Sequence, residues 1–280
     1  MKKTKLLIIG ASGSLGSSIY SFFKEKKIKI LGTYKKNKKK NFIKLDTSSK
    51  KFENKILKGI THVIICQNSF KKLDDYEIYW KKAEKLDYIY LSNFLLKLKD
   101  LNIIPIYFST DAVFDGSKGN YKETDILNPP NKYGKVKKKM EFFIKKNFSN
   151  FIIIRLSKFY SEDLTNKDFL SDMYENIKKS NVVKYASDEF FSPINSKDLN
   201  RFLYKLIKSK YNGIIHLSSA KKISRYGLAL KIKSKIKSNC IVLKTKINSL
   251  NFMAKRGKNC TLNTDKFDKM FNFKKKNFFK

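Results

Sequence analysis

The sequence has few of the residues that build disulfide frameworks and metal sites. It contains only three cysteines, Cys66, Cys240 and Cys260, which are far apart and odd in number, and two histidines. So few and so widely separated cysteines indicate reduced thiols in a cytoplasmic protein, not a secreted protein stabilised by disulfide bonds. Without paired cysteines a structural zinc site is not expected either, so we predict no metal.

Long apolar runs are also missing. The longest continuous stretches, such as Leu6–Ile9, are far shorter than the roughly 20 residues that a membrane-spanning helix needs. Lys2 and Lys3 before this run resemble the start of a signal peptide, but the run ends at Gly10. We therefore expect neither secretion nor a membrane partner.

Negative charge is scarce, since 24 acidic residues face 62 basic ones and the net charge is +38. Arginine nevertheless occurs only four times, and the lysines are spread from Lys2 to Lys280. Proteins that read nucleic acids concentrate their charge on one face and use arginine for bidentate base contacts. We interpret the charge as solvated surface that attracts anionic ligands, and expect no nucleic-acid partner.

Short apolar runs alternate with longer amphipathic stretches over the first 160 residues. Strands are expected at Leu6–Ile9, Ile28–Leu31, Phe42–Leu45, His62–Cys66, Ile103–Phe108 and Phe151–Leu156, and helices near Leu15–Lys24, Ser49–Lys58, Tyr76–Asp100 and Tyr133–Lys146. Most of these runs are apolar throughout, which is typical of strands buried on both faces of a parallel sheet. Strand–helix–strand order with right-handed crossovers predicts an α/β, doubly wound parallel sheet.

After Leu156 the pattern changes. Helices are expected at Phe169–Lys179, Lys197–Lys208 and Tyr226–Lys237, with short strands at Val182–Tyr185 and Ile214–Leu217. We therefore predict a dinucleotide-binding domain over residues 1–157, with 192–217, and a smaller C-terminal α+β substrate lobe over 158–191 and 218–280. The lysine- and phenylalanine-rich end from Lys274 is expected to be a frayed tail.

A glycine-rich loop follows the first expected strand and opens the first expected helix. Gly10 permits a tight turn, Gly13 lets a pyrophosphate approach backbone N–H groups, and Gly16 lets helix and strand pack closely. The position between strand and helix favours dinucleotide binding in a Rossmann-type fold over a merely flexible turn. The residues expected at the pyrophosphate are Gly10, Ser12, Gly13, Ser14, Leu15 and Gly16.

The second cofactor element follows the second expected strand. Tyr34, Lys35 and Lys36 stand where an NAD-specific site usually has an acidic residue for the ribose hydroxyls. Two lysines there can pair with a 2′-phosphate, which favours NADPH and keeps NADH as the alternative. Further cofactor contacts are expected from Asp46, near the adenine, and from Cys66 and Gln67, near the nicotinamide.

The candidate catalytic residues follow the fifth expected strand and begin the next helix. Thr110 lies where open α/β sheets build their sites, and Tyr133 and Lys137 share one helical face. A phenol with an ordinary pKa near ~10 is a poor acid at neutral pH, but a neighbouring ammonium lowers that pKa. Thr110 can hydrogen-bond the same carbonyl oxygen. Other Tyr-x-x-x-Lys pairs occur in this lysine-rich chain, but only Tyr133 follows Ser-Thr-Asp and a Pro-Pro turn.

These motifs resemble the extended short-chain dehydrogenase/reductases, and within them the dTDP-4-dehydrorhamnose reductase group. The matching segments are the glycine loop, STDAVFDGSKGNYKETDILNPPNKYGKVK from Ser109, RLSKFY from Arg155, SPINSKDL from Ser192, NGIIHLSS from Asn212 and KRGKNCTLNTDKF from Lys255. The resemblance implies NAD(P)H-dependent reduction of a 4-keto group on a nucleotide-diphospho-deoxysugar in cell-surface polysaccharide biosynthesis. It also implies a catalytic triad of Thr110, Tyr133 and Lys137, the last two also binding cofactor. The implied substrate contacts are Asp111, Val113, Phe114, Lys158, Arg256 and Asn259.

Some positions depart from that pattern. Ala112 replaces a usual tyrosine, Lys158 a common tryptophan, Asp87 an asparagine and Gly257 a proline, and Gln67 and Asn68 replace small residues. These changes keep open a sugar-nucleotide epimerase or dehydratase of the same superfamily. A non-catalytic NADP-binding subunit also stays open, because the regulatory subunit of methionine adenosyltransferase resembles the same group. The sugar, the nucleotide and a homodimer are likewise undecided.

Overall fold

The computed structural model describes residues 4–49, 54–161, 168–219 and 221–272. The chain divides into two compact units, the first made of Met1–Ser109, Lys132–Ile154 and Phe202–Ile214, the second of Thr110–Asn131, Arg155–Arg201 and Ile215–Lys280. Each unit is thus assembled from three separate segments. The domain boundaries expected from the sequence differ from this division and stay a prediction.

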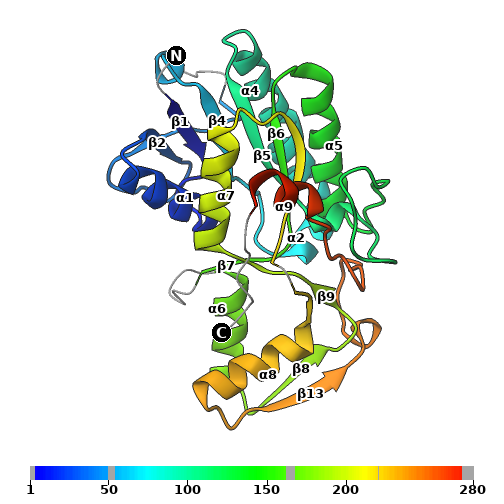
Figure 1. Cartoon of the computed structure of the whole chain (residues 1–280). Helices are drawn as coiled ribbons and strands as arrows, with labels where there is room; N and C mark the ends of the chain where they lie inside the picture. Colours follow the sequence, from blue (N-terminus) through cyan, green and yellow to red (C-terminus); the bar gives the residue numbers. More distant parts are fainter. Residues whose placement is uncertain (1–3, 50–53, 162–167, 220, 273–280) are drawn as a thin grey trace. The chain divides into compact units, whose positions relative to one another are not determined.

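A seven-stranded sheet forms the centre of the fold (Figure 1). Its order is β11-β6-β5-β4-β1-β2-β3, and the pairs from β3 through β2, β1 and β4 to β5 are parallel. The strands are β1 (Lys5–Ile9), β2 (Lys29–Tyr34), β3 (Phe42–Lys44), β4 (His62–Ile65), β5 (Ile104–Thr110), β6 (Ile152–Leu156) and β11 (Gly213–Leu217). The strand order reverses between β1 and β4, as at the switch point of a doubly wound sheet. The predicted α/β fold class is confirmed.

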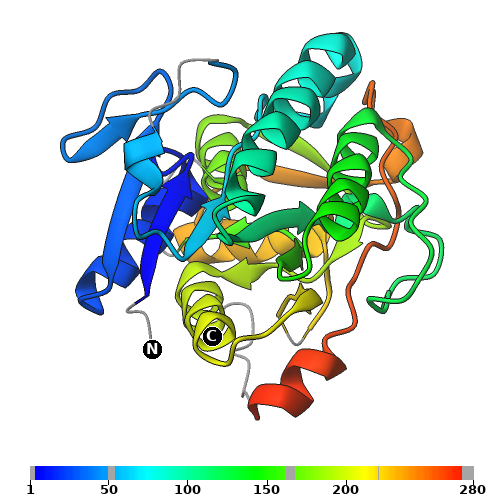
Figure 2. The same cartoon turned by 90° about the horizontal axis from the view of Figure 1, so that it is seen from above.

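Helices cover the sheet on both faces because its strands are apolar on both faces. Leu6, Leu7 and Ile8 are all fully buried, and successive side chains of a strand point to opposite sides. Figures 1 and 2 show α4 (Tyr90–Lys99) and α5 (Lys132–Asn147) on one face, and α1 (Ser14–Glu25) and α7 (Ser196–Lys208) on the other. Leu7 packs in one core cluster with residues of α4 and α5.

The segment predicted as a helix near Tyr76–Asp100 is helical, but it is not one uninterrupted α-helix. The chain instead forms α2 (Leu73–Ile78), α3 (Trp80–Glu84), a π-helical turn η2 (Lys85–Ile89) and then α4. Tyr79 ends α2 because its backbone leaves the helical region, with φ −108° and ψ 38°. Hydrophobic spacing alone does not reveal such a break, since each piece keeps an apolar side toward the core. Of the helix predicted near Ser49–Lys58, the described residues contain only the 3₁₀ turn η1 (Asn54–Leu57).

The second unit contains a small α+β cluster. Strand β8 (Val182–Ala186) pairs in parallel with β13 (Ile241–Thr245), and α6 (Phe169–Lys179) and α8 (Arg225–Ile236) share a buried core with β8. The short elements are β7 (Phe159–Tyr160), β9 (Phe190–Phe191), β10 (Ile194–Asn195), β12 (Ile223–Ser224), η3 (Asp111–Val113), η4 (Ile247–Ser249) and α9 (Asp265–Phe271). The sequence pattern predicted β8, α6 and α8 but missed β13, whose Ile241 is 55% exposed. The predicted tail from Lys274 lies outside the described residues. None of the helices in the described ranges is long and apolar enough to cross a membrane.

A buried ion pair ties the start of α8 to the segment before β9. The guanidinium of Arg225 donates to both carboxylate oxygens of Glu189, at 2.5 and 2.7 Å, and the two side chains are only 12% and 8% exposed. Burial opposes ionisation of Glu189, but the charge of Arg225 holds its pKa below the ordinary value. Both groups are therefore charged, and removing one leaves the other unpaired in a poorly solvated place.

We predict that Glu189→Ala lowers the free energy of unfolding by about 3–5 kcal/mol, because the Arg225 guanidinium loses the buried carboxylate that accepts two of its hydrogen bonds. The matched control is Glu175→Ala, which removes an exposed glutamate paired with Lys179 on the surface of α6. The control is expected to leave stability unchanged within error. Urea denaturation of both variants measures the difference, and equal midpoints would contradict the prediction.

Candidate active site

The glycine loop between β1 and α1 is shaped by close backbone packing. Gly10 has φ +80°, and a Cβ on it would lie 3.1 Å from the backbone N of Gln67. A Cβ on Gly16 would lie 2.4 Å from the carbonyl oxygen of Gly10. At Gly13, by contrast, the nearest atom to an added Cβ is the Gly10 oxygen at 3.5 Å. The chain itself therefore requires Gly10 and Gly16, whereas Gly13 leaves room beside the start of α1.

A buried threonine fixes this loop to the next strand. Thr33 of β2 is 1% exposed, and its hydroxyl donates to the Ile8 carbonyl at 2.9 Å and accepts from the Gly10 N–H at 3.3 Å. The sequence reasoning missed Thr33. The one available indication was a hydroxyl group within an otherwise apolar stretch.

The start of α1 fits a phosphate group. The hydroxyl oxygen of Ser14 is buried and has no hydrogen-bond partner among the described residues. The first backbone N–H groups of a helix also lack intrahelical partners and attract negative charge. An unpartnered hydroxyl, free N–H groups and the open side of Gly13 together match the oxygens of a dinucleotide pyrophosphate.

Of the two lysines directly after β2, Lys35 forms an ion pair with Asp46. Lys35 Nζ lies 2.9 Å from Asp46 Oδ1, with both side chains partly exposed, and Asp46 also accepts from the N–H and hydroxyl of Ser48. Partial burial raises the pKa of Asp46, but the hydrogen bonds from Ser48 and Lys35 outweigh it and hold that pKa below its ordinary value. Lys36 is exposed, and Tyr34 is partly exposed. Two of the predicted cofactor residues, Lys35 and Asp46, are thus paired with each other.

Cys66 and Gln67 follow β4 beside the glycine loop. The N–H of Cys66 donates to the Ile9 carbonyl at 2.9 Å, and burial raises the pKa of its thiol, which therefore stays neutral. The Gln67 amide donates to the Thr47 hydroxyl at 3.5 Å. These contacts and the approach of the Gln67 backbone to Gly10 place both residues beside the glycine loop, while their predicted position near the nicotinamide stays a prediction.

Tyr133 and Lys137 lie one turn apart at the start of α5. Lys137 is 4% exposed, its Nζ donates to the Phe108 carbonyl at 2.9 Å, and it lies 4.7 Å from the Tyr107 ring centre and 5.7 Å from that of Tyr133. Burial lowers the pKa of Lys137 to about 8. Tyr133 is partly exposed, and its ring meets the edge of Tyr76 at 4.9 Å. An ammonium beside an accessible phenol can support proton transfer.

The neighbouring hydroxyls Ser109 and Thr110 have different partners. Ser109 donates to the buried Glu141 of α5, whereas Thr110 donates to Asp111 at 3.1 Å and accepts from the Ala112 N–H at 3.2 Å. Ser157 donates to the other oxygen of Asp111 at 3.1 Å. Burial raises the pKa of Asp111, while the charge of Lys158 opposes this rise. Thr110 must turn its proton away from Asp111 before it can polarise a carbonyl group.

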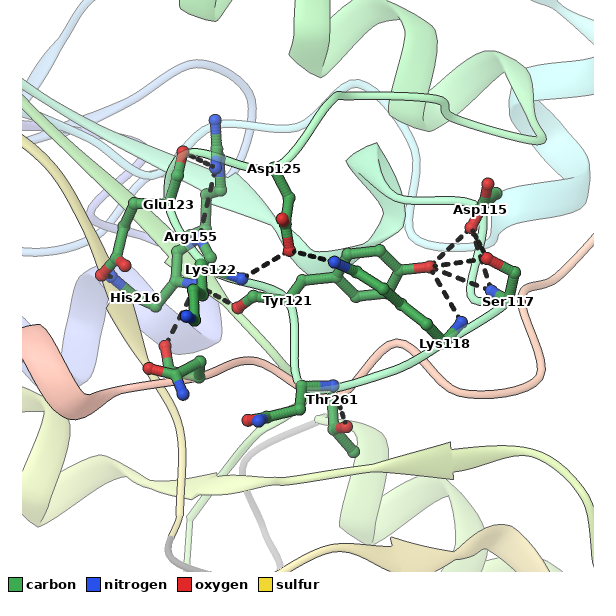
Figure 3. Close-up of polar contacts among 12 residues, drawn as sticks. Asp115, Ser117, Lys118, Tyr121, Lys122, Glu123, Asp125, Arg155, His216 and Thr261 are labelled. Carbon is green, nitrogen blue, oxygen red and sulfur yellow. Dashed lines mark hydrogen bonds and ion pairs between the residues drawn. The ribbon is translucent and has the colours of Figure 1, made fainter.

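Val113 and Phe114 are fully buried, and Phe114 stacks on Tyr121 with ring centres 4.2 Å apart. Figure 3 shows how Tyr121 is held at its other end: its hydroxyl donates to Asp115 at 2.5 Å and accepts from the Ser117 N–H at 2.9 Å. Val113, Phe114 and Tyr121 belong to one buried cluster, which packs the loop after Thr110. Direct substrate contact by Val113 and Phe114 stays a prediction.

A buried histidine connects this loop to β6 and β11. His216 Nδ1 lies 3.0 Å from the Tyr121 carbonyl, so it donates, and Nε2 accepts from Arg155 at 3.2 Å (Figure 3). Arg155 also donates to the Glu123 carbonyl at 3.1 Å. Burial and the adjacent Arg155 charge lower the pKa of His216 to about 3, so it is a neutral structural group.

The closing segment holds the last two predicted substrate residues. The Arg256 guanidinium lies 3.5 Å from the ring centre of Phe252 and, with Arg225, lowers the pKa of Glu189. Asn259 donates from its backbone to the Gly116 carbonyl at 2.9 Å, and its Oδ1 accepts from the Thr261 hydroxyl at 2.9 Å. It also lines a polar depression of about 520 Å³ in the second unit. Asn259 thus orders the segment, and its contact with substrate, like that of Arg256 and Lys158, stays a prediction.

Gly257 stands where the resemblance has proline. A Cβ on it would lie 2.7 Å from the Asp115 carbonyl and 2.8 Å from the Cα of Gly116. Two glycine backbones therefore meet at this point, which leaves no room for a proline ring. No group of three or more metal-ligating side chains occurs within the described ranges.

The fold and these residues define a Rossmann-type α/β protein of the extended short-chain dehydrogenase/reductase class, with a dinucleotide loop and a Tyr–Lys pair. Residues 4–280 match the family model described as RmlD substrate binding domain, and the chain belongs to this family.

Three relatives illustrate its range. A dTDP-4-dehydrorhamnose reductase of Aggregatibacter actinomycetemcomitans is 28% identical over 241 residues, covering 81% of this chain and 78% of that protein. Methionine adenosyltransferase 2 subunit beta of Bos taurus is 25% identical over 238 residues, covering 81% and 71%. The structure of a dTDP-4-dehydrorhamnose reductase from Bacillus anthracis str. Ames in complex with NADP has a TM-score of 0.86 at 25% identity, covering 98% and 94%.

The glycine loop yields a stability prediction. Gly16→Ala should lower the melting temperature, because its Cβ would overlap the Gly10 carbonyl and force the loop apart, at a cost of about 1–3 kcal/mol. Gly13→Ala, three residues earlier, should melt like the parent protein because its Cβ would make only an ordinary contact, 3.5 Å from the Gly10 oxygen, and its φ is −80°. Thermal unfolding of the two variants compares them directly. A loss of stability in both, or in neither, would contradict the packing described for this loop.

Proposed function

We propose that this chain is an NADPH-dependent reductase of a 4-keto group on a nucleotide-diphospho-deoxysugar, with NADH as the alternative cofactor. The observation that supports it most is the buried ammonium of Lys137 beside the accessible phenol of Tyr133. Two further observations support the same chemistry. The unpartnered Ser14 hydroxyl at the start of α1 could bind a phosphate, and a relative in this family is a dTDP-4-dehydrorhamnose reductase.

In this proposal a bound reduced nicotinamide supplies the hydride that the keto carbon receives. Tyr133 donates its hydroxyl proton to the keto oxygen, and Lys137 stabilises the phenolate that remains. Thr110 is proposed to orient the same oxygen, on the basis of its place in the sequence. Because Lys137 must stay protonated and its pKa is about 8, reductive turnover should decline as the pH rises through that value.

The cofactor groups are assigned to residues of the first unit. Ser14 and the N–H groups beside Gly13 are proposed to bind the pyrophosphate, and Lys35 the 2′-phosphate. Since Lys35 is paired with Asp46, a phosphate must compete with that carboxylate for the ammonium. NADPH preference should therefore be moderate.

A second candidate function is that of a non-catalytic subunit. It is favoured by the similarity to methionine adenosyltransferase 2 subunit beta, which extends over most of the chain. Such a protein would bind the dinucleotide without turnover. A redox-neutral epimerase or dehydratase is a third alternative on the same scaffold.

The first test is Tyr133→Phe, assayed by NADPH consumption with a dTDP-4-keto-6-deoxysugar. The kcat should fall by about 100-fold or more because the proton donor is lost, while NADPH affinity stays the same. The matched control is Tyr174→Phe, since Lys178 lies 5.8 Å from the Tyr174 ring, much as Lys137 does from that of Tyr133. The control should keep full activity.

The remaining outcomes separate the alternatives. Unchanged kcat in Tyr133→Phe rejects the proposed proton donor. Sugar turnover by the parent protein without net NADPH consumption supports a redox-neutral enzyme. Absence of turnover, with co-elution with methionine adenosyltransferase in size-exclusion chromatography, supports the subunit.

The second test concerns cofactor preference. Asp46→Asn should raise the affinity for NADPH over NADH several-fold, because it frees Lys35 and removes a negative charge near the phosphate; an exposed pair of this kind is worth about 0.2–1 kcal/mol. Lys35→Ala should lower the preference, and the exposed Lys38→Ala serves as the control for general loss of positive charge. The dissociation constants of NADPH and NADH, measured by fluorescence titration of the parent protein and the three variants, give the preference. A preference that falls equally in both lysine variants would show a diffuse charge effect instead.

A further inference from the structure

The π-helical turn η2 places an acidic side chain inside the first unit. Asp87, in the middle of Lys85–Ile89, is only 5% exposed. Isolated π turns within helices are rare and often occur at functional sites, because the extra residue redirects a side chain. Here the redirected group is a carboxylate, which is costly to bury unless it is hydrogen-bonded and charge-compensated.

The carboxylate of Asp87 is held by three donors. The N–H of Ser69 lies 2.9 Å from Oδ2 and its hydroxyl 2.7 Å from Oδ1, and the Tyr76 hydroxyl donates to Oδ2 at 2.8 Å. Donors thus reach both oxygens of the carboxylate. Burial, followed by the Asp87 charge, raises the pKa of Tyr76 well above its ordinary value, so Tyr76 stays a neutral donor. These contacts fix the carboxylate in place.

Lys137 is a buried basic group on which the charge of Asp87 acts. Burial lowers its pKa, and the Asp87 charge is the largest of the effects that raise it. The other titratable groups around Lys137 are Cys66 after β4, Tyr107 on β5, and Tyr133 and Glu141 on α5. The thiol of Cys66 and the phenol of Tyr107 are kept neutral by burial, which raises both pKa values. Glu141 accepts the hydroxyl proton of Ser109 in a hydrogen bond.

Asp87 is also linked to Tyr133 by a direct chain of contacts. Tyr76 donates to Asp87, and the ring of the same Tyr76 meets the Tyr133 ring at 4.9 Å with an interplanar angle of 65°. One buried group thus acts on both members of the Tyr–Lys pair.

We propose that Asp87 is a positioning residue of the active site, whose carboxylate keeps Lys137 in its ammonium form and, through Tyr76, fixes the ring of Tyr133. This inference rests on the proposed function for the roles of Tyr133 and Lys137. The interaction itself is a property of the folded chain and can be measured without turnover.

The test is Asp87→Asn, which keeps the shape and removes the charge. Lysine labelled with ¹³C at Cε is titrated by NMR, and the resonance that disappears in Lys137→Met is assigned to Lys137. In the parent protein it should titrate near pH 8, apart from the exposed lysines. In Asp87→Asn its midpoint should fall by about one pH unit, because the charge that raises the pKa of Lys137 is removed. The alkaline limb of kcat should move down by the same amount, with NADPH affinity unchanged.

The matched control is Glu84→Gln, which removes a partly exposed carboxylate from α3, where it pairs with Lys139. The control should leave the Lys137 midpoint in place. An unmoved midpoint in Asp87→Asn, or an equal shift in Glu84→Gln, overturns the inference. If Asp87→Asn fails to fold, Ser69→Ala replaces it: this variant removes one donor but keeps the charge, so the midpoint should stay or rise, and a fall overturns the inference.

The two proposals fail separately. A shifted Lys137 midpoint in a protein that turns over no keto sugar refutes the proposed function and leaves the charge pairing standing. NADPH-dependent turnover with an unmoved midpoint and an unmoved alkaline limb refutes the role of Asp87 alone.

Discussion

Lys137 places an ammonium group among apolar strands and phenols, where charge is poorly solvated. It is 4% exposed and has the Phe108 carbonyl as a hydrogen-bond acceptor and the rings of Tyr107 and Tyr133 as neighbours. Such a charge persists only if other groups compensate for the lost water. The π-helical turn before α4 and the hydrogen bonds that hold the buried Asp87 belong to the compensation that we propose.

The glycine loop obeys a different constraint, which is space. At Gly10 and Gly16 an added Cβ would meet the chain's own backbone, and Thr33 holds the loop against β1 through two hydrogen bonds. At Gly13 an added Cβ would make only an ordinary contact, and the buried Ser14 hydroxyl has no hydrogen-bond partner among the described residues. Packing within the chain therefore explains Gly10 and Gly16. For Gly13 the explanation that we propose is the approach of the cofactor's pyrophosphate.

In the second unit, Phe114 and Asn259, which the sequence predicts as substrate contacts, also order the chain around them, and their contact with substrate stays a prediction. Phe114 stacks on Tyr121, and the neutral His216 joins the Tyr121 carbonyl to Arg155. The Asn259 side chain accepts a hydrogen bond from the Thr261 hydroxyl in the same segment. A motif match cannot separate such residues from ligand contacts, because both kinds are fixed by the same local chain.

The sequence by itself determined the alternation of strands and helices, the position of the glycine loop, and the pairing of Tyr133 with Lys137 on one face of α5. These features depend on spacing along the chain, which side-chain periodicity and turn chemistry report directly. Only the tertiary structure decided that Ser69 and Tyr76 hold the buried Asp87, that Lys35 is engaged by Asp46, and that Ser109 turns to Glu141 while Thr110 turns to Asp111. Those partners come from different elements, and the electrostatic and hydrogen-bonding choices between them exist only once the chain has folded.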